Sequence, residues 1–129
     1  MSVEPSVNLP EVLAEVQAVF EEYERALTGN DVQALDRLFW RDDRTLRYGT
    51  GENLYGFDEI AAFRAARSPQ GLGRSIRRRS LCRFGRDFAV ANIEFVRNGD
   101  PRIGRQSQTW VRFPEGWRVV AAHVSWMQP

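Results

Sequence analysis

Apolar residues recur at intervals of three and four along the first thirty positions of the chain. They are Val12, Val16, Val19, Phe20, Tyr23 and Leu27. This spacing predicts an amphipathic helix with one buried face that ends before Gly29. The preceding stretch Asn8-Leu-Pro-Glu11 has the pattern of a capping box, so we expect the helix to begin there.

Two shorter helices and a strand are predicted next. Asn30 and Asp31 are typical capping residues for a helix that places Val32, Leu35, Leu38 and Phe39 on one side. Residues 45–48 alternate in polarity and predict a first strand. After a turn with three glycines, residues 58–67 predict a third helix, with Ile60 and Phe63 inward, that stops at Ser68-Pro69.

From Arg74 onward the period of the pattern changes from that of a helix to two. Turn-forming residues interrupt it, and the expected strands are residues 75–84, 87–97, 104–113 and 117–126. Helices followed by strands predict a single α+β domain over residues 1–129, in which three N-terminal helices pack on one face of a curved antiparallel sheet. Apolar residues fall on both faces of this sheet. We therefore expect a homodimer or higher homo-oligomer that forms through the sheet.

Composition narrows the classes of function. Of the 129 residues 43% are hydrophobic, as in an ordinary globular protein. The formal net charge is only +1, so no overall positive electrostatic field favours binding of nucleic acid. No lysine occurs, which excludes a lysine Schiff base. A lone Cys82 and the absence of a Cys/His cluster predict no disulfide and no metal site. The N-terminal ten residues have no leader-like pattern and no run is long enough to span a membrane, so we expect a cytoplasmic protein.

Candidate chemistry is concentrated between Arg44 and Arg67. Arg47 lies between Leu46 and Tyr48 on a short strand and faces opposite to both, so it is either a carboxylate ligand or a solvated edge arginine. Arg67 is either a second ligand or part of an ion pair at the end of a helix. Glu52 and Asn53 suit the polar groups of a urea and also suit a simple turn.

Two other elements contribute candidates. Tyr23 lies on the buried face of the first helix, where its hydroxyl either has a partner in the core or enters a cavity. Gln106, Gln108 and Trp110 share one face of a strand, and an amide that donates and accepts suits a neutral urea. The single histidine, His123, has no identifiable acidic partner and is excluded from the site.

Four segments together resemble the AtzH/HpxZ-like family. They are Tyr23-Glu-Arg-Ala-Leu, Arg47-Tyr-Gly-Thr-Gly-Glu-Asn-Leu-Tyr-Gly, Phe63-Arg-Ala-Ala-Arg and Gly104-Arg-Gln-Ser-Gln-Thr-Trp. The order of the elements and the terminal hairpin resemble the SnoaL-like proteins of the nuclear transport factor two-like superfamily. This resemblance implies a cone-shaped α+β barrel with a strongly curved antiparallel sheet.

The family resemblance also implies an activity. It indicates a cofactor-independent decarboxylating amidohydrolase that converts a small carboxylated urea, of the 1,3-dicarboxyurea to allophanate type, in bacterial cyanuric acid or oxalurate catabolism. The family's catalytic tyrosine and arginine fall on Tyr23 and Arg47. We expect substrate to be bound by Tyr48, Glu52, Asn53, Arg67, Gln108 and Trp110. Two alternatives remain open, namely a non-catalytic module for carboxylate binding or assembly, and isomerase chemistry on a ring ketone.

Overall fold

Three helices form in the first half of the chain, as the periodicity predicts. The computed structural model describes residues 7–128. The first six residues, which belong to the N-terminal stretch without a leader-like pattern, lie outside the described residues. The helices are α1 (Pro10–Thr28), α2 (Val32–Leu38) and α3 (Phe57–Ala66). Along α1 the predicted apolar face is buried apart from Val19, which is partly buried. The backbone N–H of Ala34 donates to the carboxylate of Asp31 (3.2 Å), which caps α2 as expected.

The predicted capping box at the start of α1 is wrong. Leu9 occupies the N-cap position, and no side chain caps the helix. Asn8 instead joins the third strand of the sheet, because its backbone N–H donates to the Arg83 carbonyl (3.1 Å) and its Oδ1 accepts from the Arg83 N–H (3.0 Å). The hydrogen-bonding groups of Asn8 are therefore used in tertiary structure.

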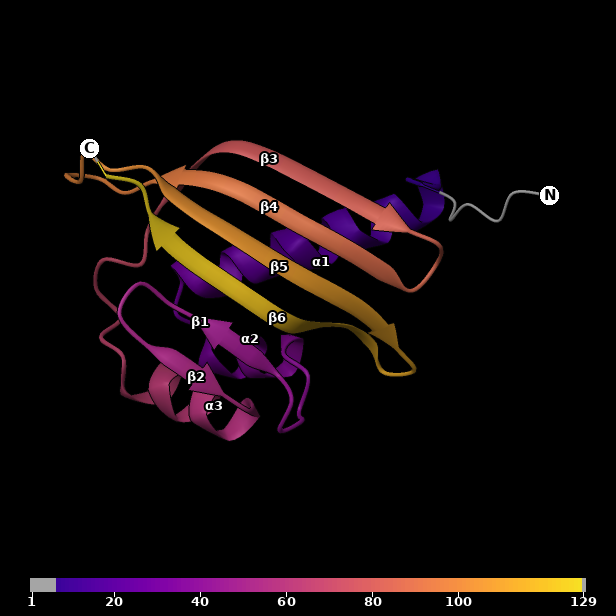
Figure 1. The fold of residues 1–129 in the computed structure, drawn as a ribbon, viewed down its shortest axis with the longest axis horizontal. Coiled ribbons are helices and arrows are strands. Elements are labelled where there is room, and N and C mark those ends of the chain that lie inside the picture. Colours follow the sequence, from indigo (N-terminus) through magenta and orange to yellow (C-terminus); the bar gives the residue numbers. More distant parts are fainter. Residues whose placement is uncertain (1–6, 129) are drawn as a thin grey trace.

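Six strands form one open sheet. They are β1 (Leu46–Tyr48), β2 (Asn53–Tyr55), β3 (Ser75–Phe84), β4 (Phe88–Val96), β5 (Gly104–Phe113) and β6 (Gly116–Trp126), in the order β2-β1-β6-β5-β4-β3. The four-strand meander is confirmed, but β2 was not predicted. β1 pairs parallel to β6, so the sheet is mixed. The prediction of a purely antiparallel sheet is therefore wrong. The prediction of a strongly curved cone is also wrong, because the sheet stays open, with β2 and β3 at its two edges (Figure 1).

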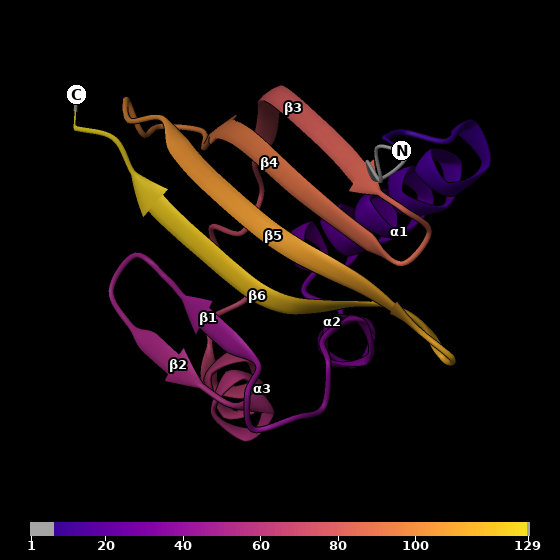
Figure 2. The same cartoon turned by 45° about the vertical axis from the view of Figure 1, so that its right-hand side comes forward.

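The helices cover one face of the sheet. Figures 1 and 2 show α1 lying across it, with α2 and α3 beside β1. On this helix-covered face β4 buries Ala89, Ala91, Ile93 and Phe95. Phe95 packs across Gly104, its partner on β5, where an added Cβ would come within 2.2 Å of the Phe95 ring. A side chain at position 104 would therefore displace this ring from the core.

Within residues 7–128 no helix lies over the opposite face, which we call the open face (Figure 2). It carries the exposed side chains of Tyr55, Phe88 and Val96. Association of two copies through this face stays a prediction. No helix among residues 7–128 is long and apolar enough to cross a membrane.

Candidate functional site

A small cavity lies under the helix-covered face, where β1, α3 and the ends of β4 and β6 meet. Its volume is about 140 Å³, below the range that is usual for pockets of drug-sized ligands, so it has room only for a very small molecule. The lining residues are Arg47, Thr50, Glu52, Phe63, Arg67, Leu72, Arg97, Val124 and Trp126. Four of the nine are charged, and three of these are arginines. We call this cavity the arginine pocket.

Arg47 points into the pocket because of its position on β1. It pairs with Ala122 of β6 in the sheet register, and Ala122 is buried on the helix-covered face. Its Nη1 donates to Glu52 Oε1 (3.0 Å), and its guanidinium lies 5.6 Å from the centroid of the Phe63 ring. A Cβ at Gly49 would come within 1.8 Å of the Glu52 carboxylate, so this pairing requires glycine there. The strand alternation thus predicted the direction of Arg47 correctly.

Arg67 follows the last turn of α3 and carries a guanidinium that has no carboxylate partner in the described part of the chain. Its Nε and Nη2 are buried and have no hydrogen-bond partner. Burial lowers the pKa of Arg67 from its ordinary value, and repulsion from Arg47 and Arg64 lowers it further, whereas the negative charge of an ionised Tyr23 acts in the opposite direction. The predicted alternative, an ion pair at the end of the helix, does not form.

Tyr23 is held at the base of this region by aromatic contacts. Its side chain is buried, with an edge-on contact to Trp110 (centroids 6.4 Å apart) and a tilted contact to Phe39 (6.3 Å). Among residues 7–128, no hydrogen bond to its hydroxyl group is formed. Tyr23 also acts electrostatically on Arg67. Tyr23 does not line the arginine pocket, but its phenol has no core partner and lies within electrostatic reach of the partly buried Arg67.

The glutamine side chains of β5 share one face, as their alternation predicted, and it is the helix-covered face. Gln106 and Gln108 are 3% and 1% exposed, and the Nε2 of each is buried without a partner. Their carbonyl oxygens are occupied, since Gln108 Oε1 accepts from the indole of Trp110 (3.1 Å) and Gln106 Oε1 accepts from Arg74 (3.1 Å). Arg74 also pairs with Glu24. Two amide donors are therefore left over beneath the sheet.

The predicted binding residues Gln108 and Trp110 do not line the arginine pocket, although they lie on the same face of the sheet as Arg47. Two others lie on the opposite side. Tyr48 pairs with His123 in the sheet register and contacts its ring edge-on on the open face (centroids 5.6 Å apart). Asn53 pairs with Tyr48 and is exposed. The pleat of β1 directs these two side chains away from Arg47, so neither lines the arginine pocket.

Comparison with known proteins identifies the family. The sequence model of the AtzH-like family matches residues 5–129. This chain belongs to the AtzH-like family. The family prediction is therefore confirmed, although no curated protein matches the chain.

Solved structures support the same assignment. A protein of unknown function from Pectobacterium atrosepticum is 60% identical to this AtzH-like chain, with 95% of each chain covered and a TM-score of 0.93. A cystatin-like fold protein from Burkholderia xenovorans is 44% identical and covers 97% of this chain and 99% of its own (TM-score 0.92). A nuclear transport factor 2-like superfamily protein from Salmonella enterica, at 22% identity with coverage of 92% and 93%, shows the fold alone (TM-score 0.72).

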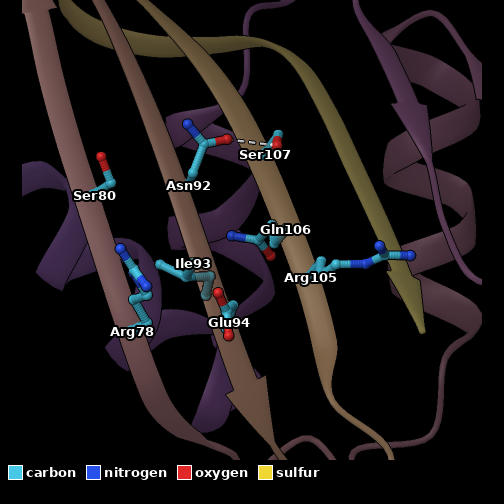
Figure 3. Close-up of a pocket in the computed structure, with 8 residues that line it drawn as sticks. All are labelled: Arg78, Ser80, Asn92, Ile93, Glu94, Arg105, Gln106 and Ser107. Atoms are coloured by element: carbon cyan, nitrogen blue, oxygen red, sulfur yellow. Dashed lines mark hydrogen bonds between the residues drawn. The ribbon is translucent and has the colours of Figure 1, made fainter. Parts of the chain in front are cut away.

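A second hollow of the AtzH-like chain lies on the open face, between β3, β4 and β5 (Figure 3). It is a shallow groove of about 260 Å³. Some of its polar groups have partners, since Ser107 Oγ donates to Asn92 Oδ1 (2.6 Å) and Glu94 pairs with Arg77 (3.5 Å). The arginines that line it, Arg78 and Arg105, are exposed to solvent. This groove therefore lacks the partly buried, unpaired cations of the arginine pocket.

The sequence analysis missed Arg97, although a signal for it exists. Arg97 comes two positions after the buried Phe95, so continued alternation past the end of β4 directs it toward the helix-covered face. It lines the pocket, and its Nε is buried without a partner. Burial lowers the pKa of Arg97, and repulsion from Arg74 lowers it further.

The donor set of the AtzH-like site favours an organic anion. Within the described residues no group of three or more His, Cys, Asp or Glu side chains could hold a metal ion. Guanidinium groups bind carboxylates through parallel hydrogen bonds. The amide donors of Gln106 and Gln108 lie on the same face of the sheet but outside the lining of the pocket. The pocket itself can therefore hold a small carboxylate.

Proposed function

We propose that this AtzH-like chain is a decarboxylating amidohydrolase acting on a small carboxylated urea, of the 1,3-dicarboxyurea to allophanate type. Family membership supports the class of reaction. The observation that carries the proposal is the half-buried guanidinium of Arg67, whose buried Nε and Nη2 have no partner and which interacts with both Arg47 and Tyr23. Buried N–H groups of a cation are costly to leave unpaired unless a bound anion compensates them.

In this proposal the arginines of the pocket bind the substrate. Arg47 and Arg67 hold one carboxylate of the substrate, each through charge-assisted hydrogen bonds. Glu52 keeps the Arg47 guanidinium oriented through their 3.0 Å contact, without neutralising Arg67. The free Nε2 groups of Gln106 and Gln108 donate to the urea carbonyl oxygen.

Tyr23 supplies the proton in the decarboxylation. When the C–N bond of an N-carboxylate breaks, the electron pair stays on nitrogen, carbon dioxide leaves, and the nitrogen takes up a proton. The hydroxyl of Tyr23 donates that proton, and water returns one to the phenolate afterwards. The positive charge of Arg67 stabilises the intervening phenolate, because opposite charges in a buried site attract strongly.

Incubation with 1,3-dicarboxyurea, with carbon dioxide and allophanate followed over time, tests the proposal. We expect turnover by the unaltered protein and a loss of about 100-fold or more in Tyr23→Phe, which keeps the ring contacts with Trp110 and Phe39. Arg47→Ala should lose turnover to a similar degree. Tyr48→Phe, on the open face, is the matched control and should keep full activity.

Two results would contradict the proposal. One is wild-type turnover in folded Tyr23→Phe and Arg47→Ala proteins. The other is the absence of any turnover together with stabilisation of the protein by carboxylates in a thermal-shift assay. The second result would instead identify a non-catalytic carboxylate-binding module.

A further inference from the structure

Arg97 reaches the arginine pocket from the side opposite to Arg47. The strand order β1-β6-β5-β4 places β1 three strand spacings from β4, which corresponds to about 14 Å between their backbones. Arg47 lies on β1 and Arg97 directly follows β4, yet both line one cavity. Their side chains therefore converge on the pocket from its two ends.

The charges that line the pocket do not cancel. Three guanidinium groups, of Arg47, Arg67 and Arg97, face a single carboxylate, that of Glu52, so two positive charges remain. Glu52 is bound to Arg47, and in the described part of the chain neither Arg67 nor Arg97 forms an ion pair. The nearby Asp100 binds Arg102 through two oxygens (3.1 and 2.8 Å) and forms no ion pair with Arg97, on which it acts only through its charge.

We propose that Arg97 binds a second carboxylate and that the pocket selects small dianions with a carboxylate at each end over monoanions. The inference rests on the proposed function and specifies its substrate class. A urea with two N-carboxylates places one carboxylate at Arg47 and Arg67 and the other at Arg97. Oxalurate has only one carboxylate and leaves the Arg97 charge uncompensated. The geometry thus favours the dicarboxylated urea.

A purely structural role for Arg97 makes a different prediction. The Arg97 guanidinium lies 5.6 Å from the centroid of the Trp126 ring and 5.7 Å from that of Phe95, which is a modest cation–π contact. Arg41 makes a comparable ring contact, with its guanidinium 4.5 Å from the Phe57 centroid, but it forms no ion pair in the described part of the chain and does not line the pocket. Arg41 is therefore a matched control for ring packing without ligand contact. Arg102 is not, because its loss would free Asp100 to act on Arg97.

Calorimetric binding of two stable acids tests the inference without relying on turnover. Glutarate has the same spacing between its carboxylates as 1,3-dicarboxyurea, and glutaramate has the same length with one carboxylate replaced by a carboxamide. We expect the unaltered protein to bind glutarate about tenfold or more tightly than glutaramate. Arg97→Gln should remove this preference by weakening glutarate alone, and Arg97→Lys should restore part of it. Arg41→Gln should keep the full preference.

The outcomes separate this inference from the proposed function. Equal binding of the two acids, no binding of glutarate, or an unchanged preference in Arg97→Gln would overturn the inference, even if 1,3-dicarboxyurea were turned over. A glutarate preference that depends on Arg97, in a protein that releases no carbon dioxide, would support the inference and overturn only the reaction. If Arg97→Gln does not fold, the salt dependence in the unaltered protein decides. The glutarate preference must then fall as salt rises.

Discussion

The two faces of the sheet use charge in opposite ways. On the open face Glu94 lies opposite Arg105 and pairs with Arg77, and neutral groups such as Asn92 and Ser107 bind each other. On the helix-covered face Arg67 and Arg97 are partly buried, and each has buried guanidinium nitrogens without a partner among the described residues. Since a folded chain normally compensates its buried charges, the difference indicates that the helix-covered face is organised for a ligand.

Loss of the buried indole should give the largest difference between the faces. Trp110 is fully buried, contacts Tyr23 edge-on and donates to Gln108. We expect Trp110→Ala to lower the free energy of unfolding by about 3–5 kcal/mol, measured by urea denaturation, because it leaves a large cavity. Its neighbour Val111 is on the open face, and Val111→Ala should cost about 1 kcal/mol or less. Similar losses for the two variants would contradict this assignment of faces.

A single added methyl group at Gly49 should affect turnover more than stability. A Cβ at Gly49 would overlap the Glu52 carboxylate, which is the flexible end of a side chain, and would push it away from Arg47. We expect Gly49→Ala to lower turnover of 1,3-dicarboxyurea by about 100-fold through loss of orientation at Arg47. The unfolding midpoint should change little. Gly51→Ala is the control, since nothing lies within 4 Å of its added Cβ. Full activity in Gly49→Ala would show that the Arg47–Glu52 pair is not required.

Removing an unpaired cation should stabilise the protein without ligand. Burial and repulsion from Arg47 both act against the charge of Arg67. We therefore expect Arg67→Met to raise the free energy of unfolding by about 1 kcal/mol while abolishing glutarate binding. Arg105→Met, on the exposed side of β5, should change stability by about 0.5 kcal/mol or less. A clear fall in the stability of Arg67→Met would mean that a partner within the protein already compensates Arg67.

The elements that could be predicted are those defined by local pattern. The apolar face of α1 and the alternation in β3 to β6 lie within continuous segments, so their periods are visible in the sequence. Strand β2 is three residues long, lies in a polar turn, and is defined by its pairing with β1. The parallel pairing of β1 with β6 joins residues more than seventy positions apart. Non-local pairing of this kind leaves no periodic signal, so the mixed, open sheet could not be predicted.

The site was predictable to the extent that strand alternation was followed throughout. Alternation gave the direction of Arg47 correctly and placed Gln106 and Gln108 on one face, without deciding which. The same rule places Tyr48 opposite Arg47, so including Tyr48 among the binding residues contradicted it. Arg97 is the last residue of the predicted strand 87–97, and alternation from Phe95 was not applied to it. That Arg67 lacks an ion pair depends on tertiary positions of carboxylates, which no local pattern contains.

The smallest expected effect concerns two carboxylates outside the pocket, each of which is hydrogen-bonded to an arginine. Hydrogen bonds from the Arg44 side chain and backbone lower the pKa of Asp42 to about 2, and Arg102 does the same for Asp100. Because the folded pKa lies below the unfolded value of about 4, any stability these pairs contribute is full above pH 4. It is lost as the pH falls through about 2. NMR titration of Arg44→Gln should move the Asp42 midpoint up toward 3.8 and leave Asp100 near 2. An unchanged Asp42 midpoint would show that this surface pair does not form in solution. Asp42 could then no longer be counted among the surface charges that have a partner, in contrast to the pocket arginines that have none.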